Sequence, residues 1–430
     1  MRARDGRGRM GSPDAPAVAP WWLQPPRWLA VLFVNLYYHS AYRIRGWGSL
    51  PSHRGPMLLV ANHQHEVESV VIVARTTVAA RSWRYPIFTV SSRRMWEPGF
   101  LAERIPWLSF FLRGINLGPL FSVMGMQPIE NELRTRPFVS LAHTLVQRHG
   151  DMAVGDVFLE RALARLPSGV KRLSDLLSPK YFRPGRTVAT LSELREPYRS
   201  ELIEATREQL EADVARFERL QRSGAIIFLT PEGFYTGDGK MGRLRGILWR
   251  LAPLAPICAV GISYDPFVGR RLSLLYRMAP AVEGLPLDVQ LKRLRPVTVS
   301  ALIATWLRNG VASFTEGEAI EAVDSQLATL PSTLFVDPEL CRRPKAVVGA
   351  AIAGMRRLGM VRLQGRQYVL TEQRSHPQFP RARDIIDYQA NFHEETLDGA
   401  RHADPANGTN SREWGGAADA TIGSRRHRSV

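Results

Sequence analysis

The chain has 430 residues, enough for two domains, and 45% of them are hydrophobic, which is usual for a globular protein. Its 57 Lys and Arg against 40 Asp and Glu give a formal charge of +17, which favours an anionic partner: nucleic acid, an anionic membrane or a phosphorylated substrate. The two cysteines exclude a disulfide framework, and a reducing cytoplasm is the simpler setting.

The N-terminal part of the chain has two segments. Residues 1–20 are polar and rich in Pro and Gly, and we predict that they are disordered. The apolar stretch 28–38 is too short to span a bilayer, but it is rich in Trp and Tyr and has arginines on both sides. This pattern favours the lipid headgroup region, so we predict an interfacial amphipathic helix in residues 21–45. A helix buried against the domain fits equally, and both can hold for opposite faces.

The stretch MLLVANHQHEVE, residues 57–68, carries the strongest functional signal. Its apolar start, 57–61, predicts a short buried strand that ends at Asn62-His63. Glu68 follows five positions after His63, and a carboxylate can orient an imidazole that takes a proton from a nucleophile. Residues five apart do not share a helix face, so the two side chains meet only if His63 lies in the loop and Glu68 in the first turn of the next helix.

Two other interpretations fit the same stretch. Asn62 can be an N-cap, and the acids can complement a helix dipole, which makes the segment an ordinary helix start. Alternatively, His63 and His65 can be metal ligands with Glu66 or Glu68 as the third, although no other histidine has ligand-like spacing.

Strand and helix patterns alternate through the first two thirds of the chain. Apolar runs predict strands at 57–61, 85–92 and 225–230 and in PICAVGISYDP and RLSLLYRMAP, a strand end in GMQPIEN, and helices from about 66, at 193–222 and at 247–251. This alternation predicts an α/β domain over residues 46–295, with a mostly parallel sheet flanked by helices and a poorly patterned insertion at about 132–222. His63 and Glu232 both follow strands, so we expect them at one sheet edge, in one site.

After Pro296 the pattern changes to helices and a hairpin. Helices are predicted in VSALIATWLRNG, TEGEAIEAVDSQLATL and PKAVVGAAIAGMRRLGM, and a hairpin in MVRLQGRQYVL. We predict a small C-terminal helical, winged-helix-like module over residues 296–395 and a disordered tail over 396–430.

With these motifs in view, the chain resembles the glycerolipid acyltransferase superfamily, which includes the lysophosphatidic acid and glycerol-3-phosphate acyltransferases. The likeness covers about residues 43–280. His63 to Glu68 stands where the family has histidine, four residues and an aspartate. SSRRMWEPGF is similar to the family's segment with a basic residue and a proline, GMQPIEN to its second block, TPEG at 230–233 to its third and APICAVGISY to its fourth.

The chain departs from the family pattern in three places. Glu68 replaces the aspartate, and a glutamate can still orient an imidazole. Asn131 and Tyr235 stand where the family has the arginines that are thought to hold the acceptor's phosphate. A neutral or bulkier acceptor is one consequence. The other is that different arginines take this role, since guanidinium binds phosphate from several directions: Arg93, Arg94, Arg134, Arg243 and Arg245.

The resemblance implies an acyltransferase that moves a fatty acyl group from acyl-CoA or acyl carrier protein to a hydroxyl of a lysophosphatidate-like glycerolipid acceptor. His63 would be the general base and Glu68 its orienting acid, with oxyanion donors among the backbone N–H groups near Gly233 or after Asn62. The co-substrate would be the thioester, with no further cofactor and no metal. The protein would act at the cytoplasmic face of a membrane, with the lipid surface as a partner.

Substrate contacts are expected from residues in and beside these motifs: Asn62, Gln64, His65, Arg94, Glu232, Gly233 and Phe234. Glu232 would either bind hydroxyls of the acceptor or fix its own loop, and Phe234 and Tyr235 would shape the acceptor pocket.

Two other functions compete with acyl transfer. The first is a metal-dependent hydrolase built on His63 and His65. The second is nucleic-acid binding through the C-terminal helices and hairpin. The third of those helices is apolar over much of its surface, whereas a DNA-reading helix offers several polar or basic side chains, so no nucleic acid is expected.

Overall fold

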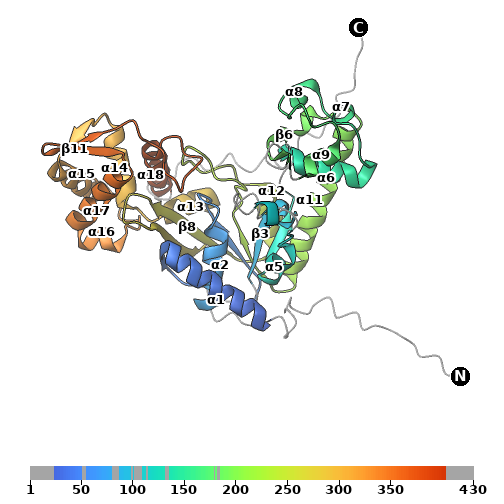
Figure 1. Ribbon diagram of the computed structural model, residues 1–430. Coiled ribbons are helices and arrows are strands. Elements are labelled where there is room, and N and C mark those ends of the chain that lie inside the picture. The colour runs from blue at the N-terminus through green and yellow to red at the C-terminus, as the bar shows by residue number, and fades with distance from the viewer. Residues whose placement is uncertain are drawn as a thin grey trace, which may run out of the picture. The chain divides into compact units, whose positions relative to one another are not determined.

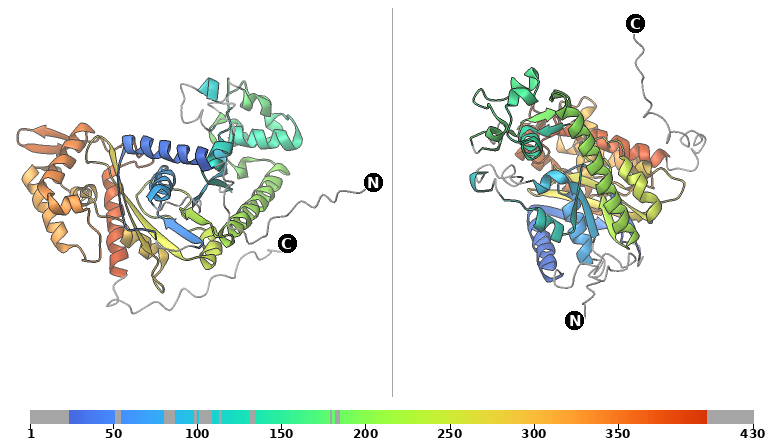
Figure 2. Two further views of the ribbon diagram at one scale, coloured as in Figure 1. Left: turned by 90° about the horizontal axis from the view of Figure 1, so that it is seen from below. Right: turned by 90° about the vertical axis from the view of Figure 1, so that its right-hand side faces the viewer.

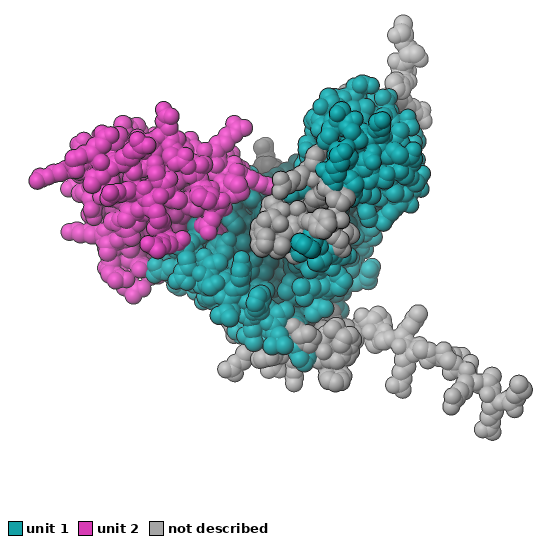
Figure 3. Space-filling model, in the orientation of Figure 1, with its two compact units in different colours: residues 1–236, 241–262, 271–281 teal, residues 237–240, 263–270, 282–430 magenta. Residues whose placement is uncertain are grey.

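The computed structural model describes residues 24–50, 55–79, 87–97, 100, 109–112, 115–130, 135–178, 180–181 and 185–402. The chain divides into two compact units (Figure 3), and each is described by itself. Unit 1 comprises residues 1–236, 241–262 and 271–281, and unit 2 comprises 237–240, 263–270 and 282–430. The longest continuous part of unit 2 begins at Val282 and includes the predicted C-terminal module.

A seven-stranded sheet in the order β1-β9-β8-β2-β7-β3-β4 organises the first part of the chain. Its strands are β1 (Tyr42–Trp47), β2 (Met57–Ala61), β3 (Ile87–Ser92), β4 (Met126–Ile129), β7 (Ile226–Leu229), β8 (Ile257–Asp265) and β9 (Leu272–Pro280). The pairs β1/β9, β2/β8, β2/β7, β3/β7 and β3/β4 are all parallel. Central strands β2 and β7 are buried along their whole length, which is why they read as unbroken apolar runs.

Helices flank this sheet, as predicted (Figures 1 and 2). Helix α2 packs on β3 and β7 and against α1, and α11 packs on β4, β7 and α12. The helical segments of this part are α1 (Gln24–Ala41), α2 (Glu68–Ala79), η2 (Arg93–Trp96), α4 (Ser109–Leu112), α5 (Gly118–Val123), α11 (Tyr198–Arg222), α12 (Gly246–Leu251) and η5 (Ala252–Leu254). The mixed α/β class with a mostly parallel sheet is therefore confirmed.

Two predicted helix limits were wrong. The N-terminal helix stops at Ala41, and residues 42–47 form edge strand β1, in which Tyr42 and Ile44 are buried and Arg43 is exposed. That alternation has the period of a strand. The long helix α11 begins at Tyr198 rather than Glu193, because Pro197 disfavours helical geometry in the residue before it.

The insertion has a core of its own, which the sequence did not predict. It consists of the antiparallel strands β5 (Thr135–Pro137) and β6 (Val188–Thr190) and of α6 (Phe138–His149), α7 (Val154–Val157), α8 (Glu160–Leu163), α9 (Leu173–Leu177) and η4 (Leu191–Glu193). Phe138, Phe158 and Leu173 are among its fully buried residues. Most of these helices are only four or five residues long, too short to show a periodic apolar pattern.

Unit 2 contains the predicted helices and hairpin. Its elements are α13 (Leu287–Leu294), α14 (Val299–Arg308), β10 (Ser313–Phe314), α15 (Glu316–Thr329), α16 (Pro338–Arg342), α17 (Pro344–Arg357), β11 (Val361–Gln364), β12 (Gln367–Leu370) and α18 (Ile385–His402). The three strands form an antiparallel sheet in the order β10-β12-β11.

The prediction of a disordered tail from residue 396 was wrong for residues 396–402, which belong to a helix. Helix α18 continues to His402, and Thr396, Gly399 and Ala400 are buried. A Cβ on Gly399 would lie 2.7 Å from the Cβ of Lys292, so glycine is needed for α18 to approach α13 this closely. Small residues that suggested a loose tail instead make a helix contact. Residues 1–20 and 403–430 lie outside the described residues.

Candidate active site

His63 and Glu68 form a close pair at the carboxyl end of β2. His63 lies in the loop after the strand, and Glu68 is the first residue of α2, as the spacing predicted. His63 Nδ1 and Glu68 Oε2 are 2.7 Å apart. The Glu68 side chain is fully buried, whereas the imidazole keeps 17% of its surface exposed. A buried carboxylate thus holds an imidazole that a substrate can reach.

Glu68 also shapes the loop that carries the histidine. Its Oε1 accepts hydrogen bonds from the backbone N–H groups of Gln64 at 2.7 Å and His65 at 2.8 Å. Both oxygens therefore have N–H partners, and the loop conformation and the imidazole orientation depend on one side chain. The Gln64 side chain is itself buried, 3% exposed, which does not favour the predicted contact with substrate.

Glu232 ties the Pro-Glu-Gly loop to His63. Its Oε1 accepts from the backbone N–H of His63 at 2.7 Å, and its Oε2 accepts from the backbone N–H of Gly242 at 2.6 Å. The residue is only 4% exposed. Of the two roles predicted for Glu232, this geometry supports fixing the loop. It also brings together the two motifs that lie 169 positions apart.

Asn62 has a structural role in place of the predicted contact with substrate. Its Nδ2 donates to the carbonyl of Ile262 at 3.1 Å, and its Oδ1 accepts from the N–H of Ile262 at 2.7 Å. The residue is fully buried. The amide side chain therefore joins the end of β2 to β8 as a backbone peptide would. A side chain that is both donor and acceptor meets this need, whereas a helix cap needs only an acceptor.

Aromatic rings pack against the two histidines of the HxH motif, and the sequence did not predict this arrangement. Tyr235 contacts the His63 ring edge to face, with centroids 5.4 Å apart, and lies nearly parallel to the His65 ring at 6.5 Å. The Tyr235 hydroxyl donates to Glu66 Oε1 at 3.4 Å. Tyr42 contacts the His65 ring edge to face, with centroids 6.3 Å apart. Tyr235 thus replaces the expected arginine with a ring that packs against the candidate base.

Arg245 reaches back to the Pro-Glu-Gly loop. Its Nε donates to the carbonyl of Glu232 at 2.9 Å, and its guanidinium lies 4.9 Å from the centre of the Phe234 ring. Gly233 has φ +74°, and a Cβ there would lie 2.5 Å from Arg245 Nε. Burial lowers the pKa of Arg245. Across the described ranges no carboxylate pairs with this half-buried guanidinium, which makes it suited to an anion. Phe234 is 43% exposed beside it, as a pocket-lining role requires.

The other arginines considered for phosphate binding are placed differently. Arg93 is held by Asp213, with NH2 and Oδ1 2.5 Å apart. Arg94 lies in η2 after β3, and its charge acts on Glu97, whose pKa is nevertheless raised because burial outweighs it. Arg243 is exposed. Asn131 and Arg134 lie outside the described residues.

The predicted oxyanion donors are already used. The N–H of His63 bonds Glu232, and those of Gln64 and His65 bond Glu68. The N–H of Gly233 donates to the carbonyl of Thr230 at 3.1 Å. These groups define the loops, and in this conformation they do not point to a developing oxyanion.

The HxH motif does not gather a ligand set. Within the described ranges, no group of three or more His, Cys, Asp or Glu residues is arranged to hold a metal ion. His65 stacks on Tyr235, and its Nδ1 accepts from the N–H of Val67 at 3.4 Å.

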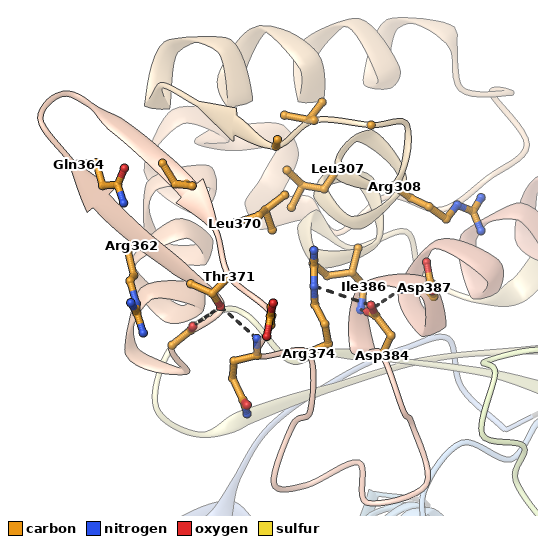
Figure 4. A pocket seen from close by; sticks show the side chains of 17 residues that line it. Leu307, Arg308, Arg362, Gln364, Leu370, Thr371, Arg374, Asp384, Ile386 and Asp387 are labelled. Atoms are coloured by element: carbon orange, nitrogen blue, oxygen red, sulfur yellow. Dashed lines mark hydrogen bonds and ion pairs between the residues drawn. The ribbon is translucent and has the colours of Figure 1, made fainter.

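Unit 2 has a separate cavity of about 1110 Å³ (Figure 4). It is lined by the β11–β12 hairpin, the end of α14 and the start of α18. Two of its arginines are engaged within the module: Arg308 Nη1 donates to Asn391 at 2.7 Å, and Arg374 lies 3.8 Å from Asp384. Apolar and charged groups of both signs are mixed in it, and no single ligand chemistry follows.

No protein-family model matches the chain, and no curated protein matches it in sequence. The functional argument therefore depends on the site geometry and on the motifs that the sequence carries.

Proposed function

We propose that this protein is an acyltransferase that moves a fatty acyl group from a thioester, acyl-CoA or acyl carrier protein, to a hydroxyl of a glycerolipid-type acceptor. The observation that carries the proposal is the 2.7 Å contact between His63 Nδ1 and the fully buried Glu68 carboxylate. This is the arrangement of a general base and the group that orients it. The order of the family-like motifs supports the same reaction.

The proton transfer of this reaction is assigned to the side chains of this pair. When the Nδ1–H group of His63 donates a hydrogen bond to the Glu68 carboxylate, the unprotonated Nε2 of the imidazole is the proton acceptor. Nε2 takes the hydroxyl proton as the acceptor oxygen attacks the thioester carbonyl. The C–O bond forms, the C–S bond breaks, and the imidazolium returns the proton to the leaving thiolate. No covalent acyl-enzyme is required, so no nucleophilic Ser or Cys is needed.

Arg245 supports a phosphate-bearing, lysophosphatidate-like acceptor. Its guanidinium is half-buried beside Glu232 and is oriented by the Glu232 carbonyl and the Phe234 ring. A guanidinium fixed in this way binds phosphate strongly, and it contacts Phe234, the residue before Tyr235, where the family has an arginine. Of the candidate arginines in the described ranges, Arg245 is therefore the one that we assign to the acceptor.

The remaining parts of the proposal concern location and the second unit. We place the enzyme on the cytoplasmic face of a membrane, and no described helix is long and apolar enough to cross one. The element order of unit 2 supports the winged-helix-like interpretation: β10 follows α14, the hairpin β11–β12 follows α17, and the three strands form one antiparallel sheet. In α17 the apolar side chains face inward, so we propose a bracing role for the module and not nucleic-acid binding.

The test is acyl transfer by the purified full chain. Wild-type protein and His63→Ala are incubated with labelled acyl-CoA or acyl carrier protein and a panel of lysophosphatidate, glycerol 3-phosphate and neutral acceptors. We expect ester formation by the wild type and a loss of at least about a hundredfold in the variant, whose thermal unfolding should be unchanged. Near-normal transfer by His63→Ala removes His63 from the mechanism. Activity that needs added zinc and stops with a chelator supports the hydrolase alternative.

A further inference from the structure

Helix α1 lies on the outside of unit 1 (Figure 1), and its exposed side chains form an apolar stripe. The stripe has the spacing i, i+3, i+4, i+7, i+8, and its exposed fractions are 69%, 51%, 69%, 73% and 57%, for Leu29, Leu32, Phe33, Leu36 and Tyr37. The opposite side of the helix packs against α2 and β1 and buries Val31. In a soluble helix the apolar stripe normally faces the core, so a second apolar face needs a partner outside the fold.

The charge around the stripe indicates what that partner is. No Asp or Glu occurs between Asp14 and Glu66. Apart from two tyrosines, His39 is the only titratable residue in positions 28–41. Basic groups collect at the C-terminal end of α1: Arg271 donates to the carbonyl of His39 at 3.1 Å, and Arg75 lies 3.1 Å from His39 Nε2. Arg43 is exposed on the adjoining strand. An apolar stripe with basic side chains at one end matches an anionic bilayer.

A chain of aromatic rings connects this surface to the candidate active site. Successive ring centroids are 5.1, 5.8, 6.3, 6.5 and 5.4 Å apart along the series Tyr37, Tyr38, Tyr42, His65, Tyr235 and His63. The series begins on the exposed stripe and ends at the candidate base. Aromatic side chains with a polar edge suit the interface between acyl chains and headgroups.

We infer that unit 1 lies on an anionic lipid surface through the Leu29–Tyr37 stripe of α1, and that a lipid acceptor reaches His63 from this surface along the aromatic series. The 18-residue helix is about 27 Å long and lies in the plane of the interface. The membrane contact itself does not depend on the reaction, whereas the route to His63 rests on the proposed function.

Vesicle flotation tests the contact without catalysis. The His63→Ala full chain is mixed with phosphatidylcholine vesicles that contain or lack phosphatidylglycerol. We expect binding to the anionic vesicles at least about tenfold tighter, and weaker in high salt. The added double change Leu32→Gln/Leu36→Gln should weaken it by at least about tenfold, since each leucine loses its apolar contact with lipid. Leu363→Gln, at a leucine that is 45% exposed on β11, is the matched control and should change binding less than about twofold.

Two results overturn the membrane contact. One is equal binding of the double variant and the control. The other is a wild-type dimer in light scattering, without vesicles, that the double change converts to a monomer, because the stripe then covers a second copy of the chain. The route is tested by kinetics with His63 intact: made in the wild-type chain, the double change should lower transfer to an acceptor embedded in vesicles and leave transfer to a short-chain soluble acceptor unchanged. An equal loss of transfer to both acceptors overturns the route. If the wild type transfers no acyl group to either acceptor, the proposed function is contradicted, whereas the membrane contact is still decided by flotation.

Discussion

Replacing Glu232 by glutamine separates its two possible roles. In the wild type the carboxylate accepts two backbone hydrogen bonds, from His63 and from Gly242, while almost fully buried. The glutamine amide keeps one acceptor oxygen and turns an NH2 group toward the other N–H donor. One hydrogen bond to a charged group is lost, and a buried donor is left without an acceptor, which costs about 2 kcal/mol.

This cost should be seen in the exchange of the two amide hydrogens. A loss of about 2 kcal/mol from the opening free energy corresponds to exchange about 30-fold faster at the amide, His63 or Gly242, that faces the new NH2 group, measured by hydrogen–deuterium exchange. The acceptor KM should stay within about threefold of wild type, and kcat should fall because the His63 loop loses its anchor. Glu66→Gln is the control: its carboxylate is exposed, and the change should leave both amides protected.

The reasoning is refuted by the opposite pattern. If Glu232→Gln leaves exchange at His63 and Gly242 unchanged and raises the acceptor KM more than about tenfold, the carboxylate contacts the acceptor and does not clamp the loop.

Three further predictions concern stability. Asn62→Ala should lower the free energy of unfolding by about 2–4 kcal/mol, because both backbone groups of Ile262 lose buried partners; unchanged stability with a raised KM would restore its predicted role in substrate binding. Gly233→Ala should cost at least about 1 kcal/mol, because a Cβ at φ +74° meets Arg245, and thermal unfolding at the wild-type temperature would contradict this. Burial lowers the pKa of His393 from 6.5 to about 4, so as the pH falls the imidazole is protonated in the unfolded chain before it is protonated in the folded one. That contribution is complete above pH 6.5 and is lost as the pH falls towards 4, by about 3 kcal/mol. The free energy of unfolding, measured in urea between pH 6.5 and pH 4, should change less with pH for His393→Gln than for the wild type. An equal change with pH in both proteins would contradict the assignment.

The sequence predicted most of the sheet because buried parallel strands are short apolar runs with clear ends. The strands at 57–61 and 226–229 and the pairing of His63 with Glu68 followed from local pattern and spacing. The edge strand 42–47 was not predicted. The apolar residues of the preceding helix lead directly into it, so the change from the helical period of 3.6 residues to the strand period of 2 is not visible in the sequence.

The structure brings His63, Glu68 and Glu232 together as predicted, whereas several neighbouring residues make contacts that the sequence did not predict. Motif order brought His63 and Glu232 to one edge, but only the fold shows that Asn62 and Glu232 bond backbone groups far away in sequence. Nothing local to residue 62 identifies Ile262 as its partner. Arg245 was one of several candidates in the sequence, and its packing against Gly233 distinguishes it. Tyr235 was seen as a missing arginine, whereas its ring contact with His63 depends on loops 169 or more positions apart.

The most direct test of the central claim compares Glu68→Gln with Glu66→Gln in steady-state transfer of a labelled acyl group. Glutamine at position 68 turns an NH2 group toward Nδ1 and favours the imidazole tautomer whose Nε2 already carries a proton. We predict that kcat falls at least about a hundredfold for Glu68→Gln, with the acceptor KM within about threefold, and that Glu66→Gln stays within about threefold of wild type. Equal activity of the two variants, or a greater loss in Glu66→Gln, would contradict a base held by Glu68.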